Sequence, residues 1–189
     1  FDAEGMLYVM DFADEEGTVY KVINGEATPF TATSDKFINP YITIVSDGRG
    51  GLWISQNRGQ FDAEPYPAYY QLAHVTSTGE FDWVVNRDTP HGLEGSSYRG
   101  ALAYDVERKI LAQGRNGKVE LYTVNYEPTI TLTPLYTIAS DDLGNNIDGL
   151  AFDYAGDLYV LSASNETFYK YVLPTEENIC VVPAAKSQA

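Results

Sequence analysis

Residues 152–160 read FDYAGDLYV, and the first nine residues of the chain read FDAEGMLYV. The two stretches share Phe, Asp, Gly, Leu, Tyr and Val at six of nine positions. Two more divergent copies lie between them, SDGRGGLWI at residues 46–54 and YDVERKILA at residues 104–112. A sequence motif that recurs along a chain is typical of repeat architectures, in which each copy is one supersecondary unit.

Each copy follows the same order: a short apolar run, a turn with Asp and often Gly, a second apolar run, a polar loop, and an alternating strand. This period of two predicts β-strands, and no segment combines a helical period with capping signals, so we expect almost no helix. The expected strands of the last two copies are 101–104, 110–113, 119–124, 135–138, 149–152, 158–161, 168–173 and 179–182.

Four strands in a unit of about 40 to 50 residues is the spacing of propeller blades. The sequence therefore predicts an all-β fold, a β-propeller of about four blade units that is part of a larger or truncated propeller. We expect one propeller domain or fragment over residues 1–189, followed at its end by a short tail. The units fall at about 1–38, 39–98, 99–145 and 146–183, and the C-terminal tail at 184–189.

The turn aspartates of the four copies have a local structural explanation. A carboxylate in a tight turn can accept backbone N–H bonds, and a nearby Gly supplies a positive φ. Because the residue recurs in every unit, whereas an active site occurs once, we interpret all four as structural. They are Asp2, Asp47, Asp105 and Asp153.

The first copy begins at its turn, so the strand expected before Phe1 is missing. A sheet without its innermost strand would expose unpaired backbone groups. The sequence is therefore interpreted as a piece excised from a longer chain, with residues 179–182 as the alternative source of the missing strand.

Composition excludes several classes of protein. The chain has 12 Lys and Arg against 27 Asp and Glu, a formal net charge of −15, which opposes binding to nucleic-acid phosphates. No apolar run approaches the roughly 20 residues of a membrane-spanning helix. Cys180 is the single cysteine, which excludes an internal disulfide and a cysteine-built metal site.

Residues 147–160, which read IDGLAFDYAGDLYV, resemble the repeat of NHL, YncE-like and gluconolactonase (SMP-30-like) propellers. That repeat often combines Asp-Gly-Leu-Ala, an Asp-x-x-Gly turn and Leu-Tyr-Val or Leu-Trp-Val. The likeness extends over all four units and is strongest in the last. It implies the fold more than an activity, because such propellers include lactonases, lyases and plain binding modules.

The resemblance to gluconolactonases implies a role for Asp148 as a ligand of a divalent cation such as Ca²⁺, which would act as a Lewis acid on a lactone carbonyl. Where that family has a ligand Asn, this chain has Gly100, preceded by Arg99, whose charge would repel the ion. We therefore favour a capping or turn role for Asp148, and no cofactor, over a metal site.

Ligands usually meet the propeller face where the links between units and the second-to-third-strand loops gather. Arginines on that face could form a pocket for a carboxylate, sulfate or phosphate group, and ion pairing with the many acidic residues is the alternative. Asn146 offers a side-chain oxygen in the link 139–148, without a known ligand spacing. The candidate arginines are Arg58, Arg99 and Arg115.

Tyr66 lies in the longest of these loops, in the stretch FDAEPYPAYY at residues 61–70. Its flat ring and hydroxyl suit a sugar ring or a protein partner, with packing within the loop as the alternative. A catalytic triad is not predicted, because His91 and Ser96 lack the Gly-x-Ser-x-Gly context and His74 falls in an alternating strand.

These features favour a noncatalytic module of a secreted or surface protein that binds a ligand or protein or serves as a scaffold. Its partner would be a small molecule, a glycan or a protein, and extracytoplasmic localisation follows from the resemblance and from low charge with many Tyr and Thr. The alternatives are a gluconolactonase-like metal-dependent hydrolase and a structural subunit whose open blade is completed by a partner strand.

Overall fold

The chain is nearly all β, as its sequence predicts. Its structure is a computed structural model that describes residues 5–10, 18–31, 41–57, 69–85, 93–94, 101–115, 117–144, 147–162, 165–174 and 187–188. The one helical element in these residues is a 3-10 turn, η1 (Asp141–Leu143), whose N-cap Ser140 accepts the backbone N–H of Asp142. No helix among them is long and apolar enough to cross a membrane.

The strands form four antiparallel sheets in chain order. Sheet 1 contains β1 (Leu7–Met10), β2 (Val19–Ile23) and β3 (Glu26–Pro29). Sheet 2 contains β4 (Tyr41–Ser46), β5 (Leu52–Asn57), β6 (Tyr69–Val75) and β7 (Phe81–Val85), and β8 (Leu93–Glu94) pairs with β6. Sheet 3 contains β9 (Leu102–Asp105), β10 (Ile110–Arg115), β11 (Lys118–Asn125) and β12 (Thr131–Ala139). Sheet 4 contains β13 (Gly149–Phe152), β14 (Leu158–Ser162), β15 (Thr167–Tyr171) and β16 (Ser187–Gln188).

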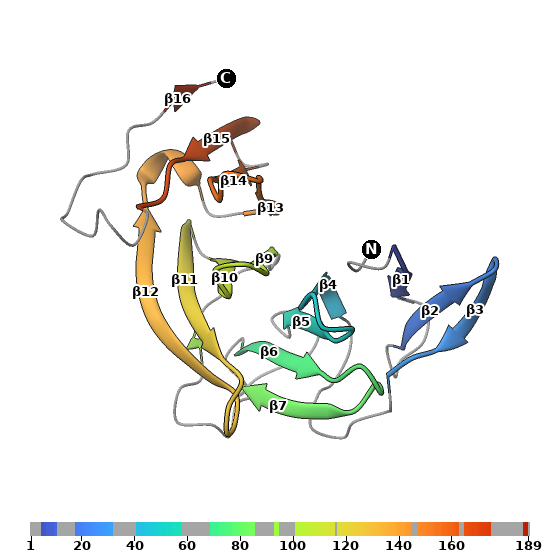
Figure 1. Cartoon of the computed structure of the whole chain (residues 1–189). Coiled ribbons are helices and arrows are strands. Elements are labelled where there is room, and N and C mark those ends of the chain that lie inside the picture. The colour runs from blue at the N-terminus through green and yellow to red at the C-terminus, as the bar shows by residue number, and fades with distance from the viewer. Residues whose placement is uncertain are drawn as a thin grey trace, which may run out of the picture.

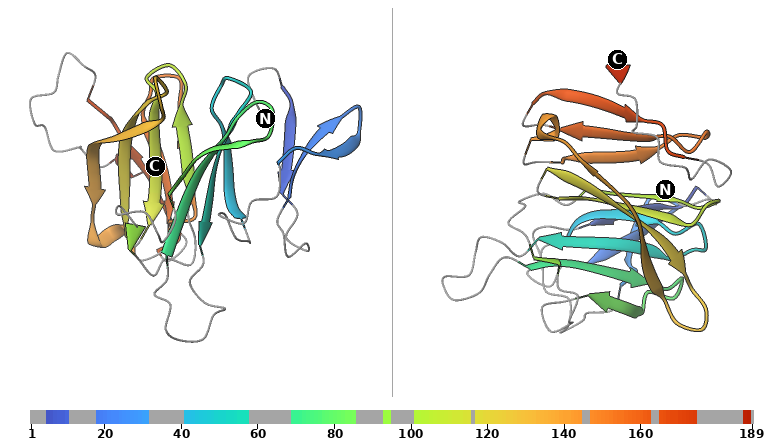
Figure 2. Two further views of the ribbon diagram at one scale, coloured as in Figure 1. Left: turned by 90° about the horizontal axis from the view of Figure 1, so that it is seen from below. Right: turned by 90° about the vertical axis from the view of Figure 1, so that its left-hand side faces the viewer.

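The four sheets lie along an arc around a common centre (Figure 1). The strands β1, β4, β9 and β13 lie nearest that centre, and β3, β7, β12 and β16 lie farthest from it. Figure 2 shows the sheets side by side as successive layers. This rotational order of small antiparallel sheets is that of a β-propeller fragment, as predicted.

Most strands lie within one or two residues of their expected positions, and β13 coincides with its prediction. β12 is longer, because it begins at Thr131 rather than at residue 135. The outer strand expected at residues 179–182 lies outside the described residues, whereas β16 pairs with β15 within the expected tail. In its described part, sheet 1 begins at β1, the counterpart of the second strand of sheet 4.

One leucine marks the same position in every sheet, and it corrects the alignment of the third copy. Leu52 pairs with Ser46 and Leu158 with Phe152, so five residues form each turn. In sheet 3, however, Leu111 pairs with Tyr104, and six residues lie between them, of which Asp105 and Ile110 also pair with each other. Leu111, not the predicted Ile110, is therefore the structural equivalent of Leu158.

The equivalent leucines define the two faces of each sheet. We call the face that turns toward the preceding sheet the leading face, and the opposite one the trailing face. Leu52 packs with residues of sheet 1, Leu111 with residues of sheet 2 and Leu158 with residues of sheet 3, each at most 1% exposed. Full burial of one such side chain stabilises a fold by about 1.5–3 kcal/mol. The sheets are thus held together by repeated leading-to-trailing packing.

Candidate functional site

The turns after the inner strands are built as predicted for a structural aspartate. Asp47 Oδ1 accepts the backbone N–H groups of Arg49 at 2.7 Å and Gly51 at 2.8 Å. Asp153 Oδ1 accepts those of Ala155 and Asp157, both at 2.9 Å. Asp105 Oδ1 accepts the N–H of Arg108 at 3.0 Å, and Asp2 lies outside the described residues. The glycines three residues after Asp47 and Asp153 have φ of +84° and +80°.

The turn of sheet 2 carries a carboxylate–imidazole–carboxylate chain that the sequence did not reveal, with Asp47 and His74 buried and Asp82 40% exposed. His74, in β6 directly opposite Trp53, is 4% exposed. Its Nε2 lies 3.0 Å from Asp47 Oδ2, and its Nδ1 lies 2.7 Å from Asp82 Oδ1. Carboxylates only accept hydrogen bonds, so a doubly protonated ring satisfies both contacts and a neutral ring only one.

Hydrogen bonds keep Asp47 charged despite its burial. Burial alone would raise the pKa of Asp47. The hydrogen bond to His74 and those from the backbone N–H groups of Arg49 and Gly51 outweigh that effect and hold the pKa below 3.8.

Two tyrosines of sheet 3 cover this chain of side chains. Trp53 Nε1 donates to Tyr126 Oη at 3.3 Å, and Tyr126 Oη donates to Tyr104 Oη at 3.1 Å. The Tyr126 ring packs edge-on against His74, with centroids 5.5 Å apart, and the guanidinium of Arg49 lies 4.5 Å from its centroid. Burial raises the pKa values of both phenols above 10. We call Asp47, Trp53, His74, Asp82, Tyr104 and Tyr126 the turn cluster.

The geometry of the turn cluster favours structure over catalysis. Both ring nitrogens of His74 are engaged, so neither faces a site where it could take a proton from a substrate. Asp47 and Asp82 bind opposite sides of the ring, so their oxygens do not converge on one point. Among the residues that the structure describes, no group of three or more His, Cys, Asp or Glu could hold a metal ion.

A cavity of about 810 Å³ lies along the axis of the fragment. The strands β4, β9 and β13 are the inner edges of their sheets and are paired on one side only within the described residues. Their other edges therefore direct backbone N–H and C=O groups toward the axis. We call this space the axial cavity, and all four sheets line it: Tyr8, Ile44, Val45, Ser46, Gly48, Leu52, Leu102, Ala103, Tyr104, Val106, Leu150, Ala151, Phe152 and Tyr154.

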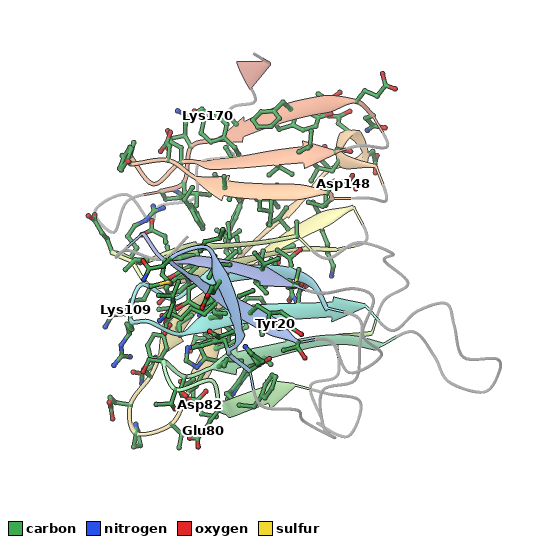
Figure 3. The ribbon with its side chains drawn as sticks, turned by 90° about the vertical axis from the view of Figure 1, so that its right-hand side faces the viewer. Tyr20, Glu80, Asp82, Lys109, Asp148 and Lys170 are labelled. Atoms are coloured by element: carbon green, nitrogen blue, oxygen red, sulfur yellow. The ribbon has the colours of Figure 1, made fainter. Side chains whose placement is uncertain are left out.

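Asp148 directly precedes β13, and its backbone N–H donates to the carbonyl of Leu161 at 2.9 Å. Figure 3 shows it at one end of sheet 4, with Lys170 near the other. No described His, Cys, Asp or Glu joins it in a metal-binding group.

The other predicted site residues are not brought together by the described part of the structure. Arg115 ends β10, where its backbone pairs with Lys118. The remaining candidates lie outside the described residues and stay predictions: Arg58, Tyr66, Arg99 and Asn146. The turn cluster was missed because it depends on which residues of β5, β6 and sheet 3 lie opposite one another, whereas the alternating pattern around His74 shows only that it is in a strand.

Comparison with known proteins supports the fold. No protein-family model matches the chain, and no curated protein sequence matches it. A solved luciferin-regenerating enzyme is similar over 89% of this chain, with a TM-score of 0.59 and 18% identity. A putative glucose dehydrogenase of Thermus thermophilus aligns over the whole chain and 83% of its own, with a TM-score of 0.41 and 13% identity.

The chain spans about half the length of the luciferin-regenerating enzyme, 55% of which is covered. At such low identity the likeness concerns the fold alone. The class that the sheets and the structural similarity define is that of the β-propellers, of which this chain forms four sheets.

Proposed function

We propose that the chain is a noncatalytic binding module of a secreted or surface-attached protein, and that its ligand occupies the axial cavity. The observation that carries the proposal is the convergence of residues from all four sheets on this one space. Binding sites are concave and largely preformed, and they combine apolar walls with a few directed polar groups.

The lining indicates the chemistry of the ligand. Tyr104, Phe152 and Tyr154 supply aromatic faces, and the inner strand edges supply backbone donors and acceptors. Aromatic faces suit the apolar face of a ring, and backbone groups suit hydroxyls at its rim. A glycan residue or a small ring-bearing glycoside has both features.

The turn cluster supports a noncatalytic role. In the described part of the chain, the imidazole of His74 is held between two carboxylates. The phenols of Tyr104 and Tyr126 hydrogen-bond to each other, and burial raises their pKa values above the usual 10. These groups fix the relation of sheets 2 and 3 and thereby shape one wall of the cavity.

The proposal is tested by removing an aromatic side chain from the cavity wall. Tyr154 lines the axial cavity and is fully exposed, so Tyr154→Ala should remove a binding surface without disturbing the core. The matched control is Tyr136→Ala, at an exposed tyrosine of β12 that does not line the cavity. In saturation-transfer NMR with a panel of p-nitrophenyl glycosides, we expect signals for the unchanged chain and for Tyr136→Ala that Tyr154→Ala abolishes. Absence of binding to the unchanged chain, or equal binding by both variants, would refute the proposal.

A gluconolactonase-like metal-dependent hydrolase is the second candidate, and the observation that favours it is the position of Asp148 at the start of inner strand β13. Calorimetric titration with Ca²⁺ tests it. Binding by the unchanged chain that Asp148→Asn removes, together with Ca²⁺-dependent lactone hydrolysis, would favour the hydrolase over the binding module.

A further inference from the structure

The two ends of the arc expose faces that are buried elsewhere in the same molecule. In sheet 4, four side chains of the leading face pack against sheet 3 and are 0–6% exposed. Leu158 pairs with Tyr171, and Val160 pairs with Tyr169. This quartet is the contact surface through which sheet 4 joins the fragment.

Sheet 1 carries nearly the same quartet at the same positions of its register. Leu7 pairs with Val22, and Val9 pairs with Tyr20, so Leu, Val and Tyr recur and only one Tyr becomes Val. Here, however, Val9 is 44% exposed and the other three are half-buried. Tyr20 is labelled in Figure 3, which views the molecule from the side of sheet 1. The leading face of sheet 1 therefore has the same composition as the leading face of sheet 4, which is buried against a neighbouring sheet.

At the other end, the trailing face of sheet 4 is apolar and exposed. Leu161 is 40% exposed, Phe168 49% and Val172 58%. The Tyr159 ring lies 5.9 Å from that of Phe168, and Lys170 Nζ lies 5.2 Å from the Tyr159 centroid. The equivalents of Tyr159 in the three earlier sheets are at most 8% exposed, because a following sheet covers them: Tyr8, Trp53 and Ala112.

We propose that the trailing face of sheet 4 of one copy packs on the leading face of sheet 1 of a second copy. The two surfaces match in kind. Each of the three contacts between neighbouring sheets within the chain already joins an apolar trailing face to an apolar leading face. They lie at opposite ends of the arc, so the contact is head-to-tail between two chains (Figure 1).

Charge does not prevent this contact. The leading face of sheet 1 presents only uncharged side chains on β1 and β2. On the facing surface, the one charge of β14 and β15 is Lys170, which forms ion pairs with Asp153 and Asp157. The overall charge of −15 acts over a longer range and is screened beyond about 8 Å at physiological salt.

The test is the mass of the chain in solution, measured by light scattering after size exclusion in 150 mM NaCl. We expect a species of at least two chains, which Phe168→Glu or Val9→Glu alone converts to monomer. Phe168 is 49% exposed and Val9 44%, so neither change removes a core side chain or should affect folding, which circular dichroism verifies. Leu135→Glu, at an equally exposed leucine away from both faces, should leave the assembly intact.

Mixing the two variants separates a head-to-tail contact from other modes of association. A Val9→Glu chain keeps its sheet 4 face, and a Phe168→Glu chain keeps its sheet 1 face. An equimolar mixture can therefore form one intact contact, and we expect a two-chain species to reappear. A monomeric unchanged chain, an assembly that survives both substitutions, or a mixture that stays monomeric would overturn the proposal.

Discussion

The turn of sheet 2 and the turn of sheet 4 have the same backbone design but different surroundings. In each, an aspartate accepts two backbone N–H groups and also contacts a basic side chain on the third strand. The contacting residues occupy equivalent positions, since His74 lies opposite Trp53 and Lys170 lies opposite Tyr159. His74 is 4% exposed, whereas 32% of the Lys170 side chain is exposed.

The difference follows from the next sheet along the arc. Tyr126 of sheet 3 covers His74, whereas Lys170 lies on the exposed trailing face. Both ring nitrogens of His74 have a carboxylate partner, Asp82 or Asp47, whereas an ammonium has three donors, one of which would stay unpaired without water. A covered position therefore favours His, and an open one accepts Lys.

Removing the aspartate of the covered turn should have the largest effect. Asp47→Ala leaves His74 Nε2 and the backbone N–H groups of Arg49 and Gly51 without their acceptor in a buried place. Breaking a buried pair in this way costs about 3–5 kcal/mol. Urea denaturation should show that loss in the free energy of unfolding.

The matched change in the open turn is Asp153→Ala, for which we expect a clearly smaller loss because water can solvate the freed groups. Equal losses for the two variants would contradict the argument that cover by sheet 3 makes the difference.

Exchanging the two basic residues, His74 and Lys170, should have the next largest effect. His74→Lys places an ammonium against Trp53 and Tyr126 and leaves at least one donor unpaired, which costs about 1–3 kcal/mol. The reverse change, Lys170→His, should leave the thermal midpoint nearly unchanged. A His74→Lys variant as stable as the unchanged chain would show that the covered position does not select its residue.

Much of the fold could be predicted from the sequence, because local patterns determine it. The alternation of apolar and polar residues placed β13 correctly, and the recurring turn motif identified four units. The extra residue in the third turn was not visible, because Ile110 and Leu111 are both apolar and only the pairing with Tyr104 distinguishes them. The turn cluster depends on contacts between residues up to 73 positions apart, such as Trp53 and Tyr126, which no local pattern encodes.

Acid should destabilise the chain through both turns. The pKa of Asp47 and that of Asp153 are lowered in the folded state, so each carboxylate stabilises the fold above the unfolded pKa near 3.8. That contribution is lost as the pH falls through the lower folded value. Urea titrations from pH 7 to pH 2 should show that acid lowers the free energy of unfolding less in Asp47→Asn than in the unchanged chain.

Salt distinguishes the contributions of Asp47 and Asp153 to this decrease in the free energy of unfolding at low pH. The contribution of the exposed Asp153, measured with Asp153→Asn, should shrink in 0.5 M NaCl, because exposed charges are screened. The contribution of the buried Asp47 should persist. Equal sensitivity of both contributions to salt would contradict the difference in burial.

The smallest effects are expected where the two turns are alike. Gly50 and Gly156 have φ of +84° and +80°, a region that costs a residue with a Cβ about 1–2 kcal/mol. Gly50→Ala and Gly156→Ala should therefore reduce the free energy of unfolding by similar amounts, in contrast to the two aspartates. A Cβ at Gly50 would lie 3.1 Å from Ser77 Cβ, whereas one at Gly156 would overlap the Arg108 guanidinium, which Asp105 and the Gly156 carbonyl hold in place, so any excess should fall on Gly156. Suppose that Gly50→Ala and Gly156→Ala differed in free energy of unfolding as much as Asp47→Ala and Asp153→Ala do. Backbone strain, rather than cover by the next sheet, would then explain why the two turns differ.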